Sequence, residues 1–229
     1  MYRFAQFALK TRKIVCIGWN YVSHIKERNA PIGLPAVFLK PPSSIIQTGG
    51  SVRICDRMVA HHEVELALVI GKTLSHCRSE VSAFDALAGY AVAIDITARN
   101  LQDEAKKKGM PWTIAKGFDT FCPVSDLISK DVLTDPHNCE LYLKINDVLK
   151  QYGSTRLMVR RIPELLSYIS SIMTLEPNDI VLTGTPEGVG PLEHGDVVNA
   201  GIVYNGSEIQ QSVLEISVER MQHSYASSV

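Results

Sequence analysis

The sequence lacks the features that define several large classes of protein. Its five cysteines are odd in number and form no C-x-x-C pair, which favours reduced, buried thiols in an intracellular compartment over structural disulfides. No apolar run approaches the roughly 20 residues that a membrane helix requires. A net charge of −1 and a pI of about 6.7 give no basic surface of the kind that binds nucleic acid. We therefore expect neither a membrane span nor a nucleic-acid partner.

Internal repeats, low-complexity stretches and clear linkers are also lacking. With 229 residues, 45% of them hydrophobic and 21% charged, the chain has the composition of an ordinary globular protein. These properties predict a single domain over residues 1–229, with an ordered core at about 13–219 and a loose tail at about 221–229.

The first 26 residues contain several basic side chains and no acidic one. Such a start is typical of a mitochondrial presequence, here a vestigial one, and equally of a structured N-terminus that is merely basic. The first interpretation predicts a mitochondrial protein, and the second leaves a cytoplasmic location open.

Residues 61–71, HHEVELALVIG, have the pattern of a β-strand around which the chain is organised. Side chains alternate between the faces of a strand, so Glu63 and Glu65 point the same way, about 6–7 Å apart. Both faces continue into apolar residues, which predicts a strand covered on both sides. Buried carboxylates become protonated or bind a cation, and a divalent metal would hold both. The alternative is a strand end with two solvated glutamates.

Asp95 is another carboxylate inside an apolar strand, predicted at residues 90–97 (YAVAIDIT). Strand interiors are depleted in aspartate, so its presence there needs a reason. Together with Glu63 and Glu65 it would complete a site made of oxygen ligands only. Such ligands suit Mg²⁺, Mn²⁺ or Ca²⁺ better than zinc.

His24 and Glu27 stand three residues apart in a short helix predicted at residues 20–31, so they share a face. A carboxylate beside an imidazole raises its basicity and fixes its orientation, as a general base requires. The same spacing is common on solvated helices, and the two residues alone do not separate these interpretations.

A further helix is predicted at residues 98–109, ending at Gly109 with a basic last turn. One of its faces carries Arg99, Gln102, Asp103 and Lys106. This face is either solvated or turned toward the carboxylates. Lys116 follows among small and apolar residues, where its ammonium group either points at a site or extends to water.

The loop TGTPEGVGP at residues 183–191 follows a buried strand predicted at residues 179–182. The hydroxyls of Thr183 and Thr185, with backbone N–H groups near the glycines, could hold a carboxylate. The loop could equally be only a tight turn.

The remaining patterns predict elements without evident chemistry. We expect strands at 13–19, 36–41, 52–55 and 139–146, helices at 79–89 and 162–173, and β-hairpins in the segments 195–206 and 214–220.

Taken together, the motifs resemble those of the fumarylacetoacetate hydrolase superfamily. They are GWNYVSH followed by Glu27, HHEVEL, the block at residues 95–118, and LTGTPEGVGP. They occur in the family's order over nearly the whole chain, and the 95–118 block and the TGTP loop are the most specific. The likeness is greatest to the small, single-domain mitochondrial acylpyruvase and oxaloacetate decarboxylase branch.

The resemblance implies a fold, a site and an assembly. The fold would be α+β and β-rich, a mixed β-roll with short flanking helices, and the protein would be a homodimer. The ligands of Mg²⁺ or Mn²⁺ would be Glu63, Glu65 and Asp95. The catalytic residues would be His24, Glu27 and Lys116, and the substrate-binding residues Arg99, Gln102 and Thr185.

Two positions depart from the family pattern. Trp19 replaces a residue that is often arginine or leucine, and Ala67 stands where glycine is common. Trp19 would alter the wall of the pocket, and so the size of the substrate more than the chemistry.

The implied reaction is metal-dependent cleavage of a C–C bond in a small 2-oxo acid. The enzyme would hydrolyse acylpyruvates to pyruvate and a carboxylic acid, decarboxylate oxaloacetate to pyruvate, or do both, through an enolate that the metal stabilises. One alternative is keto–enol tautomerisation of oxaloacetate at the same site. The other is a non-enzymatic β-roll scaffold, against which the presence of all three carboxylates with His24 and Glu27 argues.

Overall fold

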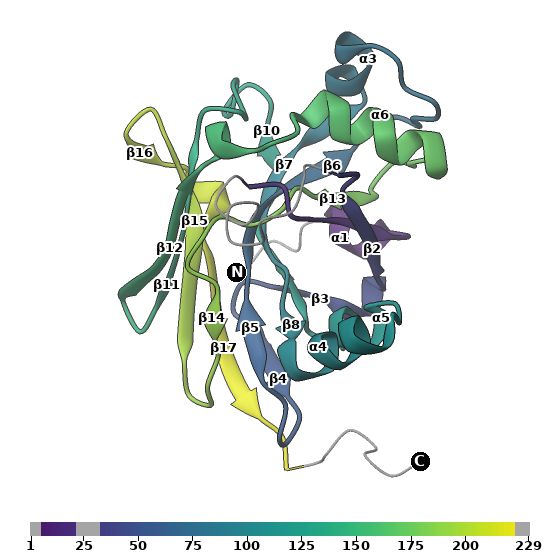
Figure 1. Ribbon diagram of the computed structural model, residues 1–229. Coiled ribbons are helices and arrows are strands. Elements are labelled where there is room, and N and C mark those ends of the chain that lie inside the picture. The colour runs from purple at the N-terminus through teal and green to yellow at the C-terminus, as the bar shows by residue number, and fades with distance from the viewer. Residues whose placement is uncertain (1–5, 22–32, 223–229) are drawn as a thin grey trace.

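The computed structural model describes residues 6–21 and 33–222. Within these residues the strands form three sheets with both parallel and antiparallel pairs, and the helices are short (Figure 1). The predicted class, a β-rich α+β fold with a mixed β-roll and short flanking helices, is confirmed.

The three sheets differ in size. The eight-stranded sheet has the order β2 (Ala36–Lys40), β1 (Ile14–Gly18), β13 (Ile180–Leu182), β6 (Val64–Ile70), β7 (Leu87–Ile94), β9 (Cys122–Val124), β3 (Ile45–Gln47), with β10 (Ile128–Ser129) paired to β7. The six-stranded sheet has the order β12 (Val148–Ser154), β11 (Glu140–Ile145), β15 (Val197–Tyr204), β17 (Leu214–Arg220), β4 (Ser51–Ile54), with β16 (Ser207–Glu208) paired to β15. The three-stranded sheet has the order β14 (Gly190–Pro191), β5 (Ala60–His62), β8 (Thr97–Ala98).

The helices of the described residues are short. They are α1 (Gln6–Lys10), α3 (Glu80–Asp85), α4 (Arg99–Lys108), α5 (Thr113–Lys116) and α6 (Ile162–Ile172), with 3₁₀ turns at Pro42–Ser44, Thr155–Leu157 and Gln210–Ser212. Phe7 of α1 packs against the face of the eight-stranded sheet that carries Ala67 and Val69. In Figure 1, α3 and α6 pack together at the top of the molecule, and α4 and α5 lie at the lower right. No helix in this part of the chain has the length and apolar character needed to cross a membrane.

Strand β6 is buried at every position, as its apolar pattern predicts. Its even-numbered residues belong to the main core, which also takes side chains from the six-stranded sheet. Ala67 and Val69 face the other side of the sheet and pack in a second cluster with small residues such as Ala91 and Ala93 of β7. Glu63 and Glu65 continue this second face toward the start of the strand.

The chain changes sheets at Glu63 and again at Asp95. Strand β5 ends just before Glu63 and pairs with β8 and β14, whereas β6 begins just after it and pairs with β7 and β13. Likewise β7 ends just before Asp95, and β8 begins two residues later. The backbone N–H of Asp95 donates to the carbonyl of Glu63 at 2.8 Å, so the two breaks lie side by side. This arrangement brings both carboxylates to one place.

Seven predicted elements agree with the structure to within one residue at each end, including the helix that begins at Arg99 and ends before Gly109, whose φ is +65°. The strand predicted at 61–71 is divided at Glu63 into β5 and β6. The strand predicted at 90–97 is β7, which begins at Leu87 and ends at Ile94, so Asp95 lies just beyond the strand and not inside it.

The helix predicted at 79–89 is wrong in its length, because α3 ends at Asp85 and Gly89 belongs to β7. A Cβ at Gly89 would lie 2.3 Å from the carbonyl oxygen of Ile128 in β10, so this glycine permits strand contact and does not end a helix. The helix predicted at 20–31 lies almost entirely outside the described residues.

Candidate metal and active site

A cavity of about 290 Å³ is lined by the residues at the two strand breaks. It brings together seven of the predicted site residues, which are Glu63, Glu65, Asp95, Arg99, Gln102, Lys116 and Thr185. The other two, His24 and Glu27, lie outside the described residues. Their positions and roles therefore stay predictions.

Three carboxylates converge at this cavity. One oxygen each from Glu63, Glu65 and Asp95 lies within 4.8 Å of the others. The three residues are 9%, 2% and 0% exposed, respectively. Three negative charges this close in a dry place repel one another strongly, so the site requires compensating cations.

Lys116 supplies one of these cations. Its Nζ lies 3.0 Å from Oε2 of Glu63 and 2.6 Å from Oδ2 of Asp95, and the residue is 1% exposed. Burial alone would lower the pKa of Lys116, but Asp95 and Glu63 outweigh burial and raise this pKa above 10.5. Of the two interpretations left open by the sequence, the structure shows the one in which the ammonium group points at the site.

Arg99 holds the other oxygen of Glu63. Its Nη2 lies 2.7 Å from Oε1 of Glu63, and its Nη1 donates to Oε1 of Gln102 at 2.7 Å. Thr97 also donates to Oε1 of Glu63, at 3.1 Å. Burial would raise the pKa of Glu63, but Lys116 and Arg99 lower it to about 2, so this carboxylate is ionised at neutral pH.

Lys40 is a site residue that sequence analysis missed. Its buried Nζ lies 2.9 Å from Oδ1 of Asp95, but it donates to the backbone carbonyls of Ile96 at 2.9 Å, Lys116 at 2.6 Å and Phe121 at 2.9 Å. An ammonium group has three hydrogens, and these carbonyls take all of them. Oδ1 of Asp95 is therefore close to a positive charge but has no hydrogen-bond donor. The sequence signal that could have identified Lys40 is a lysine within the otherwise apolar strand predicted at 36–41.

Glu65 has different bonding partners from Glu63, which lies two positions before it. Its Oε2 accepts a hydrogen bond from the backbone N–H of Gly184 at 2.6 Å, and it has no ion-pair partner among the residues described. Burial, with Asp95 and Glu63 nearby, raises the pKa of Glu65 well above its ordinary value. A bound divalent cation would reverse this effect.

The TGT segment after β13 follows the edge of β6 without forming a regular ladder. The hydroxyl of Thr183 donates to the carbonyl of Leu66 at 2.8 Å, and that of Thr185 donates to the carbonyl of Val64 at 2.7 Å. Both hydroxyl hydrogens are therefore committed to the strand. The loop fixes the position of β6 beside the cavity, and Thr185 also lines that cavity.

Aromatic rings also line the cavity. The rings of Trp19 and Trp112 meet edge to face at 5.4 Å, and Phe38 lies 5.5 Å from Trp112. Lys116 lies 4.8 Å from the centre of the Phe38 ring. Trp19 has a φ of +63°, an uncommon conformation for so bulky a residue. Trp19 is thus part of the pocket wall, and its effect on substrate size stays a prediction.

The donors present fit a divalent metal ion. The three carboxylates offer oxygen atoms within 4.8 Å of one another, and one buried oxygen, Oδ1 of Asp95, has no hydrogen bond. Carboxylate oxygens are the ligands that Mg²⁺ and Mn²⁺ prefer.

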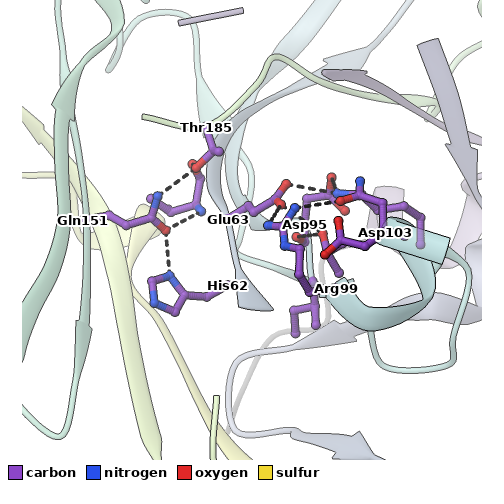
Figure 2. Close-up of polar contacts among 12 residues, drawn as sticks. His62, Glu63, Asp95, Arg99, Asp103, Gln151 and Thr185 are labelled. Atoms are coloured by element: carbon purple, nitrogen blue, oxygen red, sulfur yellow. Dashed lines mark hydrogen bonds and ion pairs between the residues drawn. The ribbon is translucent and has the colours of Figure 1, made fainter. Parts of the chain in front are cut away.

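Figure 2 shows the polar contacts in two groups on either side of Glu63. Asp95 and Arg99 lie on one side, and His62, Gln151 and Thr185 on the other. Gln151 was also missed by sequence analysis, because it lies in β12, a strand that the sequence patterns did not predict.

The fold and the site define a carboxylate-rich pocket, suited to a divalent cation, in a mixed β-roll. The chain belongs to the fumarylacetoacetate hydrolase family, since the family described as "Fumarylacetoacetate (FAA) hydrolase C-terminal" matches residues 13–216.

Among the relatives is the mitochondrial oxaloacetate tautomerase FAHD1 of Arabidopsis thaliana, which is 50% identical over 88% of this chain and 90% of its own. The mitochondrial oxaloacetate tautomerase of Schizosaccharomyces pombe is 47% identical over 91% of this chain and 96% of its own. A yeast fumarylacetoacetate hydrolase family protein of known structure has a TM-score of 0.87 and 37% identity, covering 96% of this chain and 99% of its own. The chain is thus homologous to enzymes.

Proposed function

We propose that this chain is a metal-dependent enzyme acting on small 2-oxo acids, and that its main reaction is keto–enol tautomerisation of oxaloacetate. The observation that carries the proposal is the convergence of three buried carboxylates, one oxygen of which has no hydrogen-bond donor, on a cavity that Arg99 also lines. The names of the relatives support this reaction. Sequence analysis gave it as the alternative to C–C bond cleavage.

The parts of the site divide into metal binding and substrate binding. Glu63, Glu65 and Asp95 would hold Mg²⁺ or Mn²⁺, which when bound would act as a Lewis acid toward the 2-oxo group. Lys116 keeps two of these carboxylates in place. Arg99, whose side chain is 24% exposed, would bind a substrate carboxylate, with Gln102 fixing its guanidinium group.

Tautomerisation moves a proton between C3 of oxaloacetate and the oxygen on C2. We assign this transfer to His24, oriented by Glu27. The assignment rests on their spacing in the sequence and on the resemblance to the family. A cavity of about 290 Å³ is at the small end of ligand pockets, which suits a four-carbon acid.

C–C bond cleavage is the second candidate function, because the matched family is described as a hydrolase. Hydrolysis of an acylpyruvate would require a base to activate water, and His24 would serve. Decarboxylation of oxaloacetate would require no water. Both reactions use the same metal and the same substrate-binding groups as tautomerisation.

The test compares three reactions on one purified sample with saturating Mg²⁺ or Mn²⁺. They are the decay of enol-oxaloacetate followed by ultraviolet absorbance, the release of pyruvate from oxaloacetate, and the hydrolysis of acetylpyruvate. Buffer with metal alone corrects for the uncatalysed rates. We expect tautomerisation to be the fastest, and excess EDTA to abolish it. Activity that survives EDTA would exclude the metal site, and absence of tautomerisation would exclude the proposed reaction.

The role of His24 is tested by the variant His24→Ala. The loss of a base costs about 10²–10⁴-fold in rate. We expect this loss for tautomerisation and for acetylpyruvate hydrolysis, with a smaller loss for decarboxylation. Equal losses of kcat in hydrolysis and decarboxylation would mean that His24 does not activate water.

Location and assembly are also proposals. We propose a mitochondrial location, because relatives from a plant, an animal and a yeast are named mitochondrial. Cell fractionation tests it, and a cytoplasmic signal would support the alternative. The homodimer implied by the family resemblance is tested by light scattering of the purified protein.

A further inference from the structure

Gln151 lies on β12, at the edge of the six-stranded sheet, and is 0% exposed. Its Oε1 accepts hydrogen bonds from the backbone N–H of Val64 at 3.0 Å and from Nδ1 of His62 at 2.8 Å. Its Nε2 donates to Oγ1 of Thr185 at 2.9 Å and to the carbonyl of Pro186 at 3.0 Å. All four hydrogen-bonding positions of this buried amide are therefore used.

Gln151 and its partner Thr185 both form hydrogen bonds with Val64, the residue between the proposed metal ligands Glu63 and Glu65. Gln151 binds the N–H of Val64, and Thr185, which accepts from Gln151, donates to the carbonyl of Val64 at 2.7 Å. Strand β13 pairs with β6 only opposite residues 67–69, so it does not reach Val64. The side chains of Gln151 and Thr185 thus supply the hydrogen bonds that a neighbouring strand would supply.

The loop that carries Thr185 is seated directly on β12. A Cβ at Gly153 would lie 2.4 Å from Cβ of Pro186, so the loop and the strand approach more closely than any other residue would allow. This contact seats the loop on β12 next to Gln151, with Thr185 one residue before Pro186.

We infer that Gln151 is a positioning residue for the metal site. By accepting from the N–H of Val64 and donating to Thr185, which binds the carbonyl of Val64, it sets the directions in which Glu63 and Glu65 leave the backbone at the point where the chain changes sheets. It bears no charge and does not line the cavity, so its contribution is to geometry alone. The inference rests on the metal site of the proposed function.

The experiment measures Mn²⁺ binding by calorimetry for the full chain and for Gln151→Met, which keeps the length of the side chain but none of its hydrogen bonds. Outer partners of metal ligands typically contribute about 10–100-fold in affinity, and we expect the Kd to rise by that factor. The control is Ser212→Ala. Ser212 is also 0% exposed and also satisfies a strand N–H, that of Ile202 at 2.8 Å, but does not line the cavity.

We expect Ser212→Ala to leave the Kd unchanged even if it lowers the melting temperature. A Kd for Gln151→Met equal to that of the wild-type chain overturns the inference, as does an equal loss in Ser212→Ala. A wild-type chain that binds no Mn²⁺ instead overturns the proposed metal site itself.

If Gln151→Met does not fold, a second variant, Gln151→Glu, tests the inference. Gln151→Glu keeps an oxygen that accepts from Val64 and His62, but as a carboxylate it cannot donate to Thr185 or Pro186. We expect a Kd for Mn²⁺ no weaker than that of the wild-type chain, because the oxygen that accepts from the N–H of Val64 is kept. A weakened Kd overturns the inference.

Discussion

The two sides of the carboxylate site differ in the kind of chemical group that surrounds the carboxylates. On the charged side, Lys40, Arg99 and Lys116 come from β2, α4 and α5. On the neutral side, Gln151, the TGT segment and the N–H of Gly184 come from β12 and the loop after β13. The charged side supplies positive charge, and the neutral side supplies hydrogen bonds to backbone groups and to one carboxylate.

Glu63 and Glu65 show what this difference does. They lie two residues apart on one face of a strand, yet their pKa values move in opposite directions. Burial acts on both, but Lys116 and Arg99 lower the pKa of Glu63 to about 2, whereas Asp95 and Glu63 add to the effect of burial and raise the pKa of Glu65. Among the described residues, Glu63 has ion-pair partners and Glu65 has a hydrogen bond from the N–H of Gly184, so a bound metal ion would stabilise the charge of Glu65 in particular.

The largest expected effect follows from removing the carboxylate on the neutral side. Glu65→Ala should weaken Mg²⁺ and Mn²⁺ binding by more than about 100-fold, since even outer partners of metal ligands contribute 10–100-fold, and should abolish turnover. The metal-free variant should melt no lower than the wild-type chain, because a buried like charge has been removed. Calorimetry and thermal melts measure both quantities. Retained turnover at low metal concentration would exclude the three-carboxylate site.

The next effect comes from removing a cation on the charged side. Lys116→Met leaves Glu63 and Asp95 buried without their shared partner, which should lower the free energy of unfolding of the metal-free protein by about 3–5 kcal/mol. Saturating Mn²⁺ should restore part of this loss. Urea unfolding with and without metal measures it.

Lys72→Met is the matched control, because Lys72 pairs with Asp85 at 2.8 Å on the surface, with both side chains about two-thirds exposed. Exposed pairs contribute little, so unfolding should hardly change. If both variants lose the same stability, the buried position of Lys116 has no special role.

A smaller effect is expected from the neutral side. Thr183→Val removes the 2.8 Å hydrogen bond to Leu66 but leaves that carbonyl bonded to the backbone N–H of residue 183 at 3.2 Å. The free energy of unfolding should fall by only about 1 kcal/mol. Urea unfolding measures this, and a loss as large as that of Lys116→Met would remove the distinction between the two sides.

The smallest expected effect is that of a reductant on the melting temperature, and it concerns the cysteine thiols, some of which lie near the charged side. All five cysteines are free, which confirms the expected absence of disulfides, and a reductant should leave the melting temperature unchanged. Burial raises the pKa of Cys16 and raises that of Cys122 to about 12, so neither thiol should react with a thiol reagent in the folded protein. Only Cys55, which is partly exposed, should react readily. Rapid modification of Cys16 or Cys122 would show that the charged side opens to solvent.

The periodicity of the sequence predicted seven elements closely and placed Glu63 and Glu65 on one face, because strand alternation and helix periodicity are local. The fold class and the set of three metal ligands were implied by the family resemblance of the motifs. Turn chemistry is local too, so Gly109 was identified correctly as the end of α4. Gly89 was misassigned because the reason for it is the carbonyl of Ile128 in a neighbouring strand.

Only the tertiary structure decided which groups surround the carboxylates. Lys40 reaches Ile96 from 56 residues away, and Gln151 reaches His62 from 89 residues away, through strand pairings that no local pattern specifies. The opposite pKa shifts of Glu63 and Glu65 depend on distant partners, because burial acts on both, Lys116 and Arg99 lower the pKa of Glu63, and Asp95 and Glu63 raise that of Glu65. Sequence periodicity determines which way a side chain points, and the packing of distant segments determines what it meets there.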